Sequence, residues 1–511
     1  MSIKDKLISN SLFLTLFSVS DALLFMVFWL ILGKTLEPAS YGIVALSLQI
    51  VSFVSSVAIV GMAYTANKLI PEYLKTGRKD EMQGLIYVSL AAAAMAAIVV
   101  SLGFLLVFVL APGVIKLDSQ AMLITAVASV IVTLSVIAMN KQIGFQNMKR
   151  IFIVSIIGDS VLVAAVVASV YFGLGYIGPI IAYLIASSLV LALRLQKKFF
   201  SLSKKPVVDS HTILRYAVPS CVVCLLAVLA SNTQYIILSA LKTPEVIGLF
   251  AVAMKIGFVL SVPPIVSRGL FPIISELSVD AKTKPRQARL ISLTFRYEAL
   301  MLLVMTALLL VFGRQLILFF ASPEYMQAIE VLPILVIANM FASFSDHFTT
   351  SLYAIGEPKK YRNANLVSTA AYLVLSVALT YYFSAVGLAV AFLVYNAMLF
   401  FISLAYTRAS IPFRFPTVDI AKIVVATALS SAPLLLVVQT IPDVFVAIPF
   451  VIGSLVLNVL ILFVLRFFAE EDLKVLDYGI ERLPLFRKEA LWIREHFAKL
   501  VNARDEGRQC R

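Results

Sequence analysis

Residues 85–110 read LIYVSLAAAAMAAIVVSLGFLLVFVL and contain no charged side chain. A helix of roughly 20 apolar residues crosses the ~30 Å hydrocarbon core of a bilayer, so this stretch predicts a transmembrane helix. Apolar runs of similar length recur from Ser11 to Leu465. Because these runs are continuous and do not alternate with polar residues, they favour helices over closed barrels, the other structure that can span lipid.

The composition of the whole chain agrees with this interpretation. Of its 511 residues, 61% are hydrophobic and 14% are charged, and the mean hydropathy is +0.98. Hydropathy predicts about fourteen spans, at residues 11–32, 41–63, 85–110, 121–140, 151–172, 176–193, 216–238, 246–266, 295–312, 329–352, 365–383, 386–406, 420–440 and 444–465. The sequence therefore predicts an all-α polytopic membrane protein that acts in or across a bilayer.

Loop charges predict the orientation of the chain. Basic residues gather in alternate loops, at Lys68, Lys75, Arg78, Lys79, Lys141, Lys149, Arg150, Arg194, Lys197, Lys198, Lys204, Lys205, Lys282, Lys284, Arg286, Arg289, Lys359, Lys360, Arg362, Arg408 and Arg414, whereas the opposite loops hold only Lys34, Lys116, Lys242 and Arg314. The positive-inside rule predicts that the basic loops and both termini are cytoplasmic, as expected for a plasma-membrane protein with an even number of spans. Most of the net charge of +14 then lies in the loops that orient the chain in the membrane. We therefore expect attraction to anionic lipids and no nucleic-acid partner.

The two ends of the chain differ in character. The first apolar run, which ends at Leu32, is too long for a signal peptide and is followed by no clear cleavage site, so we expect a retained first helix. Residues 466–511 mix apolar and charged residues. This pattern predicts a basic amphipathic tail on the cytoplasmic membrane surface, and a solvated helix with one packed stripe is the alternative.

The chain contains an internal repeat. The matches are Pro38-Ala-Ser-Tyr-Gly42 with Pro244-Glu-Val-Ile-Gly248, Leu69-Ile-Pro71 with Leu270-Phe-Pro272, Gly144 with Gly356, and Gly178 with Gly387. The matched glycines lie 206 to 212 residues apart. Six spans per repeat place the two halves parallel, an arrangement that transporters use with a binding site between the halves. We expect an N-terminal lobe at 1–200, a C-terminal lobe at 201–412 and two further helices at 413–465.

Two charged residues lie deep in predicted spans. Asp21 and Lys255 are each about ten residues from a span end, which at ~1.5 Å per residue places them near mid-membrane. A charge at that depth costs roughly 2.5–3.5 kcal/mol on insertion scales and faces a bundle interior or water. Because the two residues belong to different lobes, they are candidates for a central cavity. The alternative is a buried ion pair, or a neutralised group, that serves helix packing.

Other polar residues in the spans are further binding candidates. They are Gln49 in the second span, Asn232 and Gln234 in the seventh, Asn339, Ser343, Asp346, His347 and Thr350 on one face of the tenth, and Arg215 and Arg268 nearer the cytoplasmic ends. Helical spacing makes the stripe on the tenth span continuous. Small and hydroxyl residues also hold transmembrane helices together, and long basic side chains near helix ends extend to the interface, so both structural interpretations remain open.

Motifs of soluble-type catalysis do not occur in this sequence. It contains no Walker A loop, no H-E-x-x-H and no G-x-S-x-G. Cys221 and Cys224 form a C-x-x-C inside an apolar run, where small packing residues are a better interpretation than a redox or metal site. We expect neither an enzyme nor a bound cofactor or metal.

Three motifs, in this order, resemble a known group of transporters. They are Leu36-Glu-Pro-Ala-Ser-Tyr-Gly42, Gly248-Leu-Phe-Ala-Val-Ala-Met-Lys255-Ile and Tyr353-Ala-Ile-Gly356-Glu-Pro-Lys359. Together with the arrangement of six, six and two spans, they resemble the polysaccharide transport branch of the multidrug/oligosaccharidyl-lipid/polysaccharide flippase superfamily. The resemblance covers roughly residues 5–470. It implies two lobes around a central cavity and the flipping of a lipid-linked oligosaccharide between leaflets.

The resemblance also implies roles for particular residues. Members often carry a cation in the cavity, and Lys255 matches that position in the eighth span. A cation there would pair with a diphosphate linker, while hydroxyl and amide groups would hydrogen-bond sugars. Asp21 would exchange a proton or pair with Na⁺ as the coupling ion, unless removal of the product drives transport. Glycan-assembly enzymes are the expected protein partners.

Three alternatives stay open at this stage. A multidrug/cation antiporter of the same superfamily fits Asp21, but fits the last two spans and Lys255 less well. A lipid II flippase fits the architecture, but such proteins tend to have several cavity arginines, and the mid-membrane spans here have none. A membrane-embedded glycosyltransferase would need acidic metal ligands at a membrane face and usually a sizeable outer loop.

Overall fold

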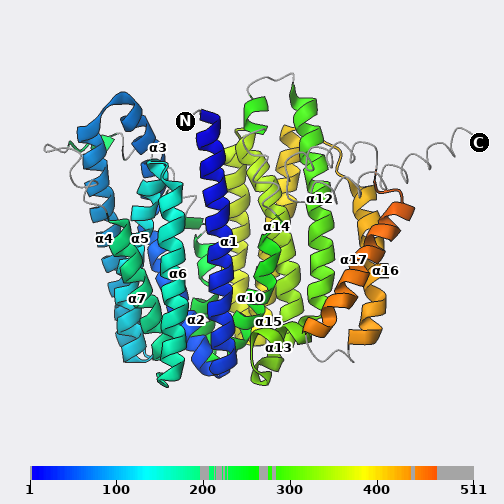
Figure 1. Cartoon of the computed structure of the whole chain (residues 1–511), viewed down its shortest axis with the longest axis horizontal. Helices are drawn as coiled ribbons and strands as arrows, with labels where there is room; N and C mark the ends of the chain where they lie inside the picture. Colours follow the sequence, from blue (N-terminus) through cyan, green and yellow to red (C-terminus); the bar gives the residue numbers. More distant parts are fainter. Residues whose placement is uncertain are drawn as a thin grey trace, which may run out of the picture. The chain divides into compact units, whose positions relative to one another are not determined.

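The computed structural model describes residues 3–195, 207–211, 213, 221, 225–226, 228–263, 274–278, 283–438 and 444–468. Every regular element in this part of the chain is helical (Figure 1). The chain divides into two compact units, Met1–Val279 with Gly313–Ser410 (unit 1) and Asp280–Phe312 with Ile411–Arg511 (unit 2). The all-α fold predicted from the sequence is confirmed.

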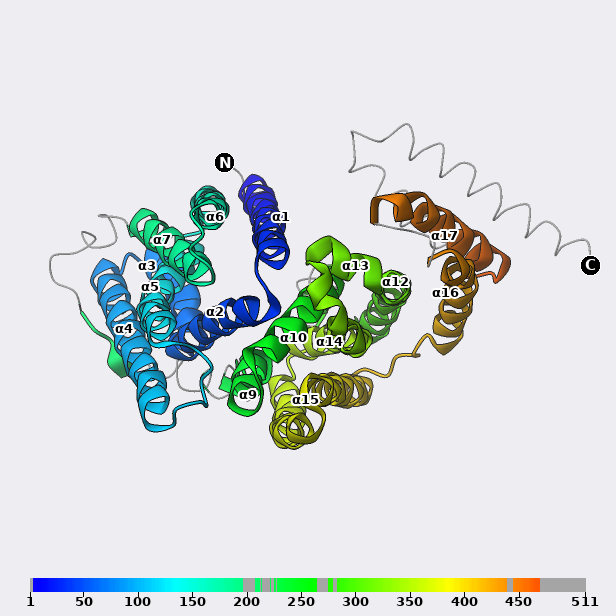
Figure 2. The ribbon, with the colours of Figure 1, turned by 90° about the horizontal axis from the view of Figure 1, so that it is seen from below.

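The N-terminal helices of unit 1 form one bundle. They are α1 Ile3–Thr35, α2 Pro38–Ala58, α3 Met62–Thr76, α4 Lys79–Leu110, α5 Ser119–Gly144, α6 Met148–Tyr171 and α7 Ile177–Arg194. Helix α5 packs against α2, α4 and α7, and α6 packs against α1 and α7 (Figure 2). On the buried face of α5, Thr125, Ser129 and Thr133 each donate to the carbonyl four residues earlier, which satisfies their hydroxyls and lets neighbouring helices approach closely.

The C-terminal helices of unit 1 form a second group. They are α9 Gln234–Leu241, α10 Pro244–Gly257, the 3₁₀ helix η2 Phe258–Ser261, α13 Gly313–Phe320, the 3₁₀ helix η4 Pro323–Glu330, α14 Leu332–Ala354 and α15 Pro358–Ser410. The most extensive packing is between α14 and α15, and α10 lies against α14. The rings of Phe341, Phe344 and Phe348 on α14 meet Phe400 on α15, so an aromatic cluster holds the pair together.

Helices α2 and α10 join the two groups within unit 1. They are the equivalent helices of the predicted repeat, each starting at a proline that is followed four residues later by a glycine, and they pack along one another (Figure 2). Both are interrupted within the predicted span. Helix α2 ends before Gly61, which has φ +78°, and α10 gives way to the 3₁₀ turn η2.

The predicted spans agree with most of the helices. Eleven described helices are long and apolar enough to cross a membrane, and the bent pair η4 and α14 makes twelve. The turn predicted between residues 383 and 386 is confirmed, because α15 breaks at Ser384, where φ is 55° and ψ is −138°. Part of the span predicted at 216–238 and nearly all of the tail predicted at 466–511 lie outside the described residues. The number fourteen and the lobe boundaries therefore stay predictions.

Unit 2 consists of α12 Lys284–Val311, α16 Thr417–Val437 and α17 Val444–Val464 among its described residues. Helix α16 packs against both other helices. Ser454 on α17 donates to the Ser430 carbonyl at 3.0 Å, and the Asn458 amide donates to the hydroxyls of Thr427 and Ser430 at 3.3 and 3.2 Å. These polar contacts inside apolar helices hold α16 and α17 together, as hydrogen bonds commonly do between transmembrane helices.

Candidate functional site

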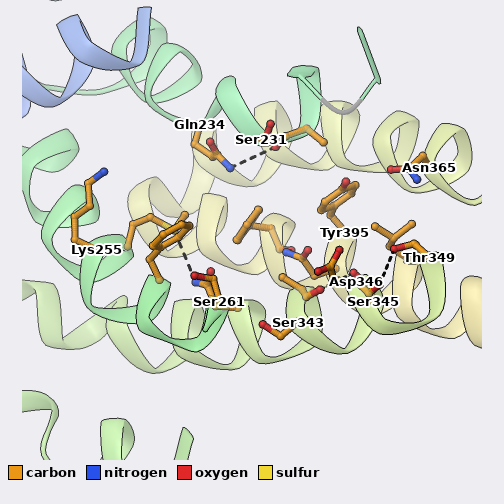
Figure 3. Close-up of a pocket in the computed structure, with 18 of the residues that line it drawn as sticks. Ser231, Gln234, Lys255, Ser261, Ser343, Ser345, Asp346, Thr349, Asn365 and Tyr395 are labelled. Atoms are coloured by element: carbon orange, nitrogen blue, oxygen red, sulfur yellow. Dashed lines mark hydrogen bonds between the residues drawn. The ribbon is translucent and has the colours of Figure 1, made fainter. Parts of the chain in front are cut away.

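A polar cavity of about 480 Å³ lies in unit 1 between α2 and the C-terminal helices. Its lining consists of amides, hydroxyls, aromatic rings and a few apolar groups with one lysine and one aspartate, namely Gln49, Ala230, Ser231, Gln234, Tyr235, Met254, Lys255, Phe258, Ser261, Asn339, Ala342, Ser343, Ser345, Asp346, Thr349, Tyr361, Asn365, Phe392, Tyr395, Asn396 and Leu399. Figure 3 shows Lys255 at one end of this cavity, with Asp346 and Thr349 on α14 opposite Tyr395. Such a volume suits a small ligand or part of a larger one.

Lys255 meets two aromatic rings of α1. Its Nζ lies 4.6 Å from the centroid of the Trp29 ring and 5.7 Å from that of Phe25. Cation–π attraction of this kind is worth about 0.5–2 kcal/mol, depending on how far the cation is desolvated. The lysine is half-buried and its charge is held by rings, so an incoming anion could replace the rings as its partner.

The α14 wall presents polar groups whose local hydrogen bonds are satisfied. Ser343 Oγ donates to the Leu260 carbonyl at 2.6 Å, which fixes η2 against α14. The Asn339 amide donates to the Leu335 carbonyl at 2.8 Å. Asp346 and Thr349 follow on the same side of the helix. These side chains give the α14 wall of the cavity its polar character.

An amide bridge links α2 to the segment before α9. The Gln49 amide and the Ser52 hydroxyl both donate to Asn232 Oδ1 at 2.9 Å. Asn232 in turn donates to Ser231 Oγ, also at 2.9 Å. At the edge of the cavity, the bridge joins the N-terminal bundle of unit 1 to the segment that leads into its C-terminal group of helices.

Asp21 lies in a separate cavity of the N-terminal bundle. This cavity, of about 250 Å³, is also lined by Asp159, Tyr183 and Arg194. The Arg194 guanidinium donates to Ser135 Oγ and Ser155 Oγ at 3.0 Å each and to the Ser135 carbonyl at 3.2 Å. Asp159 Oδ2 is buried, and no hydrogen-bond partner is recorded for it among the described residues. Two carboxylates and one guanidinium therefore share one space in the apolar part of the bundle.

The twelve candidates named from the sequence thus fall into distinct groups. Lys255, Gln49, Gln234, Asn339, Ser343 and Asp346 line the main cavity, Asn232 borders it through Gln49, Asp21 lines the second cavity, Thr350 lines neither, and Arg215 and Arg268 lie outside the described residues. His347 is 1% exposed and packs edge-on against Phe348, so it lies away from the cavity.

Sequence reasoning missed the wall that α15 contributes. Tyr361, Asn365, Tyr395 and Asn396 line the cavity from this helix. The available signal was weak, because Tyr361 and Asn365 adjoin a basic loop in which polar residues are expected, and Tyr395 and Asn396 are an isolated pair in an apolar run. The spacing of four residues between Tyr361 and Asn365, and the polar pair at 395–396, were the features that could have identified them.

Sequence and structure comparisons identify the family of the chain and proteins that share its fold. The family profile described as "Polysaccharide biosynthesis protein" matches residues 7–278, more than half of the chain. The solved structure of "Lipid II flippase MurJ, inward closed conformation" gives a TM-score of 0.66 at 14% identity, over 88% of this chain and 98% of that one. An inward-facing multidrug resistance MATE family transporter of the MOP superfamily gives 0.61 at 15% identity, over 78% and 94%.

A third structure, that of the MATE multidrug transporter DinF-BH, gives a TM-score of 0.55 at 17% identity, over 81% of this chain and 98% of that one. At such identities the likeness to these structures is one of fold. No curated protein sequence matches this chain. The profile match and the shared fold point to the same kind of multi-pass membrane protein.

Proposed function

The chain is a member of the polysaccharide biosynthesis protein family with the fold of MOP-superfamily transporters, and we propose that it flips a lipid-linked oligosaccharide across the plasma membrane. The glycan would move from the cytoplasmic to the outer leaflet by alternating access, for assembly of a surface polysaccharide. Parallel repeats that rock about a central site are a known architecture for such movement. Both termini would lie in the cytoplasm, as the loop charges predict.

The observation that carries this proposal is the composition of the main cavity. Among the described residues that line it, Lys255 and Asp346 are the only charged ones, and the rest are amides, hydroxyls, aromatic rings and small apolar groups. Amides and hydroxyls both donate and accept hydrogen bonds, which matches the dense hydroxyls of a sugar. Lys255 supplies the charge that would pair with an anionic polyprenyl phosphate or diphosphate linker.

The geometry supports a sequence of contacts. The linker would displace the Trp29 and Phe25 rings from the Lys255 ammonium, because a charge-assisted hydrogen bond is stronger than a cation–π contact. The glycan would then lie along α14 and α15, and the polyprenyl chain would stay in lipid. Glycan-assembly enzymes would deliver the substrate and consume the product.

We propose that the second cavity couples transport to an ion. Asp21, Asp159 and Arg194 share it, and with both carboxylates ionised their charges sum to −1. One proton or one Na⁺ would neutralise the set, and an apolar surrounding favours the neutral state. Because α1 carries both Asp21 and Trp29, occupancy of this cavity would be transmitted along α1 toward Lys255.

A flipping assay in proteoliposomes tests the main proposal. A polyprenyl-diphosphate oligosaccharide whose terminal sugar is removed by an external glycosidase should be cleaved completely with the protein present, and only in the outer leaflet without it. Lys255→Ala should lose most of this additional cleavage, whereas Lys359→Ala, at an exposed lysine outside the cavity, should behave like the native protein. Cleavage that does not depend on the protein would overturn the proposal.

A multidrug antiporter is the second candidate, and the acidic pair in the N-terminal cavity favours it. It predicts efflux of cationic dyes driven by a proton or Na⁺ gradient. A lipid II flippase would instead accept the lipid-linked peptidoglycan precursor in the same glycosidase-type assay. Dye efflux without glycan flipping would replace the main proposal, and metal-dependent sugar transfer by the purified protein would indicate an enzyme.

A further inference from the structure

Unit 2 contains a cavity of its own, at the start of α12 and α16. Its volume is about 440 Å³, and it is lined by Pro285, Ala288, Arg289, Ser292, Leu293, Arg296, Pro412, Phe413, Arg414, Pro416 and Asp419. It shares no residue with the cavity assigned to the transported glycan. One wall is a face of α12, and the other is the segment that leads into α16.

Specific contacts fix the two walls against one another. Ser292 Oγ donates to the Arg414 carbonyl at 2.9 Å, which ties the segment to α12. Next to it the ring centroids of Phe295 and Phe415 lie 5.2 Å apart. These contacts hold the Arg414 backbone in a defined position beside the cavity.

Arg296 forms the inner end of this cavity. Its Nε lies 3.3 Å from Asp419 Oδ2, its guanidinium stacks 4.1 Å from the Phe467 ring centroid, and it donates to the Phe467 carbonyl. Lys422 Nζ lies 3.9 Å from the other oxygen of Asp419. The single carboxylate of the lining is therefore shared by two cations.

The charge of the lining is strongly positive. Arg289, Arg296 and Arg414 oppose only Asp419 among the described lining residues, so the lining has a net charge of +2. Arg289 and Arg414 are exposed at the cavity. Arginine binds phosphate through paired N–H donors in a planar fork, which makes it a preferred ligand for that group.

The position of the cavity favours the headgroup of a membrane lipid over a free phosphate as its ligand. It lies at the ends of two helices that are long and apolar enough to cross the membrane, α12 and α16, and helix ends lie at the depth of the lipid headgroups. Leu293, Phe413 and the prolines give it apolar walls beside the arginines. Basic pockets between transmembrane helices bind the headgroups of anionic lipids.

We propose that this pocket binds the phosphate headgroup of an anionic phospholipid of the surrounding bilayer. Arg289 and Arg414 contact the phosphate, and Arg296 holds Asp419 away from it. The lipid bridges α12 to the segment before α16, and so stabilises unit 2 independently of the transported substrate.

The test compares phosphatidylglycerol with phosphatidylcholine around the full-length protein. In nanodiscs that contain phosphatidylglycerol, the native protein should melt at a higher temperature and retain the lipid in native mass spectrometry. The double variant Arg289→Gln/Arg414→Gln should bind phosphatidylglycerol roughly tenfold more weakly, as expected for the loss of charge-assisted contacts. The double variant Arg362→Gln/Arg408→Gln, at two exposed arginines of α15 outside the pocket, should match the native protein.

A lysine variant and a second probe test the proposal further. Arg289→Lys/Arg414→Lys keeps the charge but loses the planar fork, so it should bind with intermediate strength even if the glutamine variant fails to fold. Inorganic diphosphate is the second probe, because a free phosphate compound has the same chemistry. Two outcomes would overturn the assignment to a membrane lipid. One is an equal melting temperature in the two lipids, and the other is a rise in melting temperature with diphosphate when phosphatidylglycerol causes none.

Discussion

Gly42 and Gly248 pack reciprocally where α2 and α10 cross. A Cβ atom on Gly42 would collide with the carbonyl oxygen of Pro244, and a Cβ atom on Gly248 would collide with the carbonyl oxygen of Pro38. Each glycine thus faces the first residue of the opposite helix, and the two contacts are related by the internal repeat. Glycine is required at both positions because only a residue without a side chain permits this backbone approach.

Alanine at either position should therefore weaken the contact between the two halves of unit 1. We expect Gly42→Ala to lower stability by about 1–3 kcal/mol, the usual cost of overpacking, and Gly248→Ala to do the same. Thermal unfolding in detergent measures the effect. Gly103→Ala is the matched control, because nothing lies within 4 Å of a Cβ atom built there. Equal melting temperatures of the Gly42 and Gly103 variants would show that the close approach of α2 and α10 contributes nothing to stability.

The orientation of the chain is testable by cysteine labelling. In a background in which Cys221, Cys224 and Cys510 are replaced by serine, cysteines are introduced at Lys242 and Lys359. These two lysines lie in loops that the charge bias assigns to opposite sides. A membrane-impermeant thiol reagent added outside should label the first position and not the second. Labelling of position 359 alone would reverse the orientation and with it the proposed direction of transport.

The sequence predicted helix positions well because bilayer thickness fixes the length of an apolar run. The turn at Ser384 was found because the apolar run exceeds one crossing. The breaks after α2 and α10 were not found, because the sequence stays apolar through both. Hydropathy measures how far a segment tolerates lipid, and it carries no information on whether a helix stays continuous inside a protein interior.

The candidate site was predicted less completely, for a geometric reason. Depth estimates suggested that Asp21 and Lys255 could share one cavity, but Lys255 meets Trp29, eight residues after Asp21 on α1. Eight residues of helix extend about 12 Å, and the two charges lie in different cavities. Counting residues gives the depth along one helix, but only the packing of neighbouring helices decides which side chains meet.

The role of Asp21 leads to the third prediction. Asp21→Asn keeps the shape of the side chain and removes its charge, so the protein should fold and insert normally while its transport loses dependence on the proton or Na⁺ gradient. Asp159→Asn should have the same effect, because both carboxylates line the same cavity as Arg194. Glu324→Gln, at an exposed residue outside that cavity, serves as control. Transport that responds to pH and Na⁺ as in the native protein would make Asp21 a packing residue.

Lys255 is the subject of the last prediction. Lys255→Ala should abolish most flipping without loss of expression. Lys255→Arg should retain part of it, because the positive charge of the side chain matters more than its length for the binding of a diffuse anion. A charge-assisted pair is worth roughly 1.5–3 kcal/mol, so the affinity for a short-chain polyprenyl diphosphate should fall about ten- to a hundredfold. Trp29→Phe keeps a ring beside the Nζ atom and should bind nearly as the native protein. Normal flipping by Lys255→Ala would move the diphosphate contact elsewhere, with Arg215 and Arg268 as the next candidates.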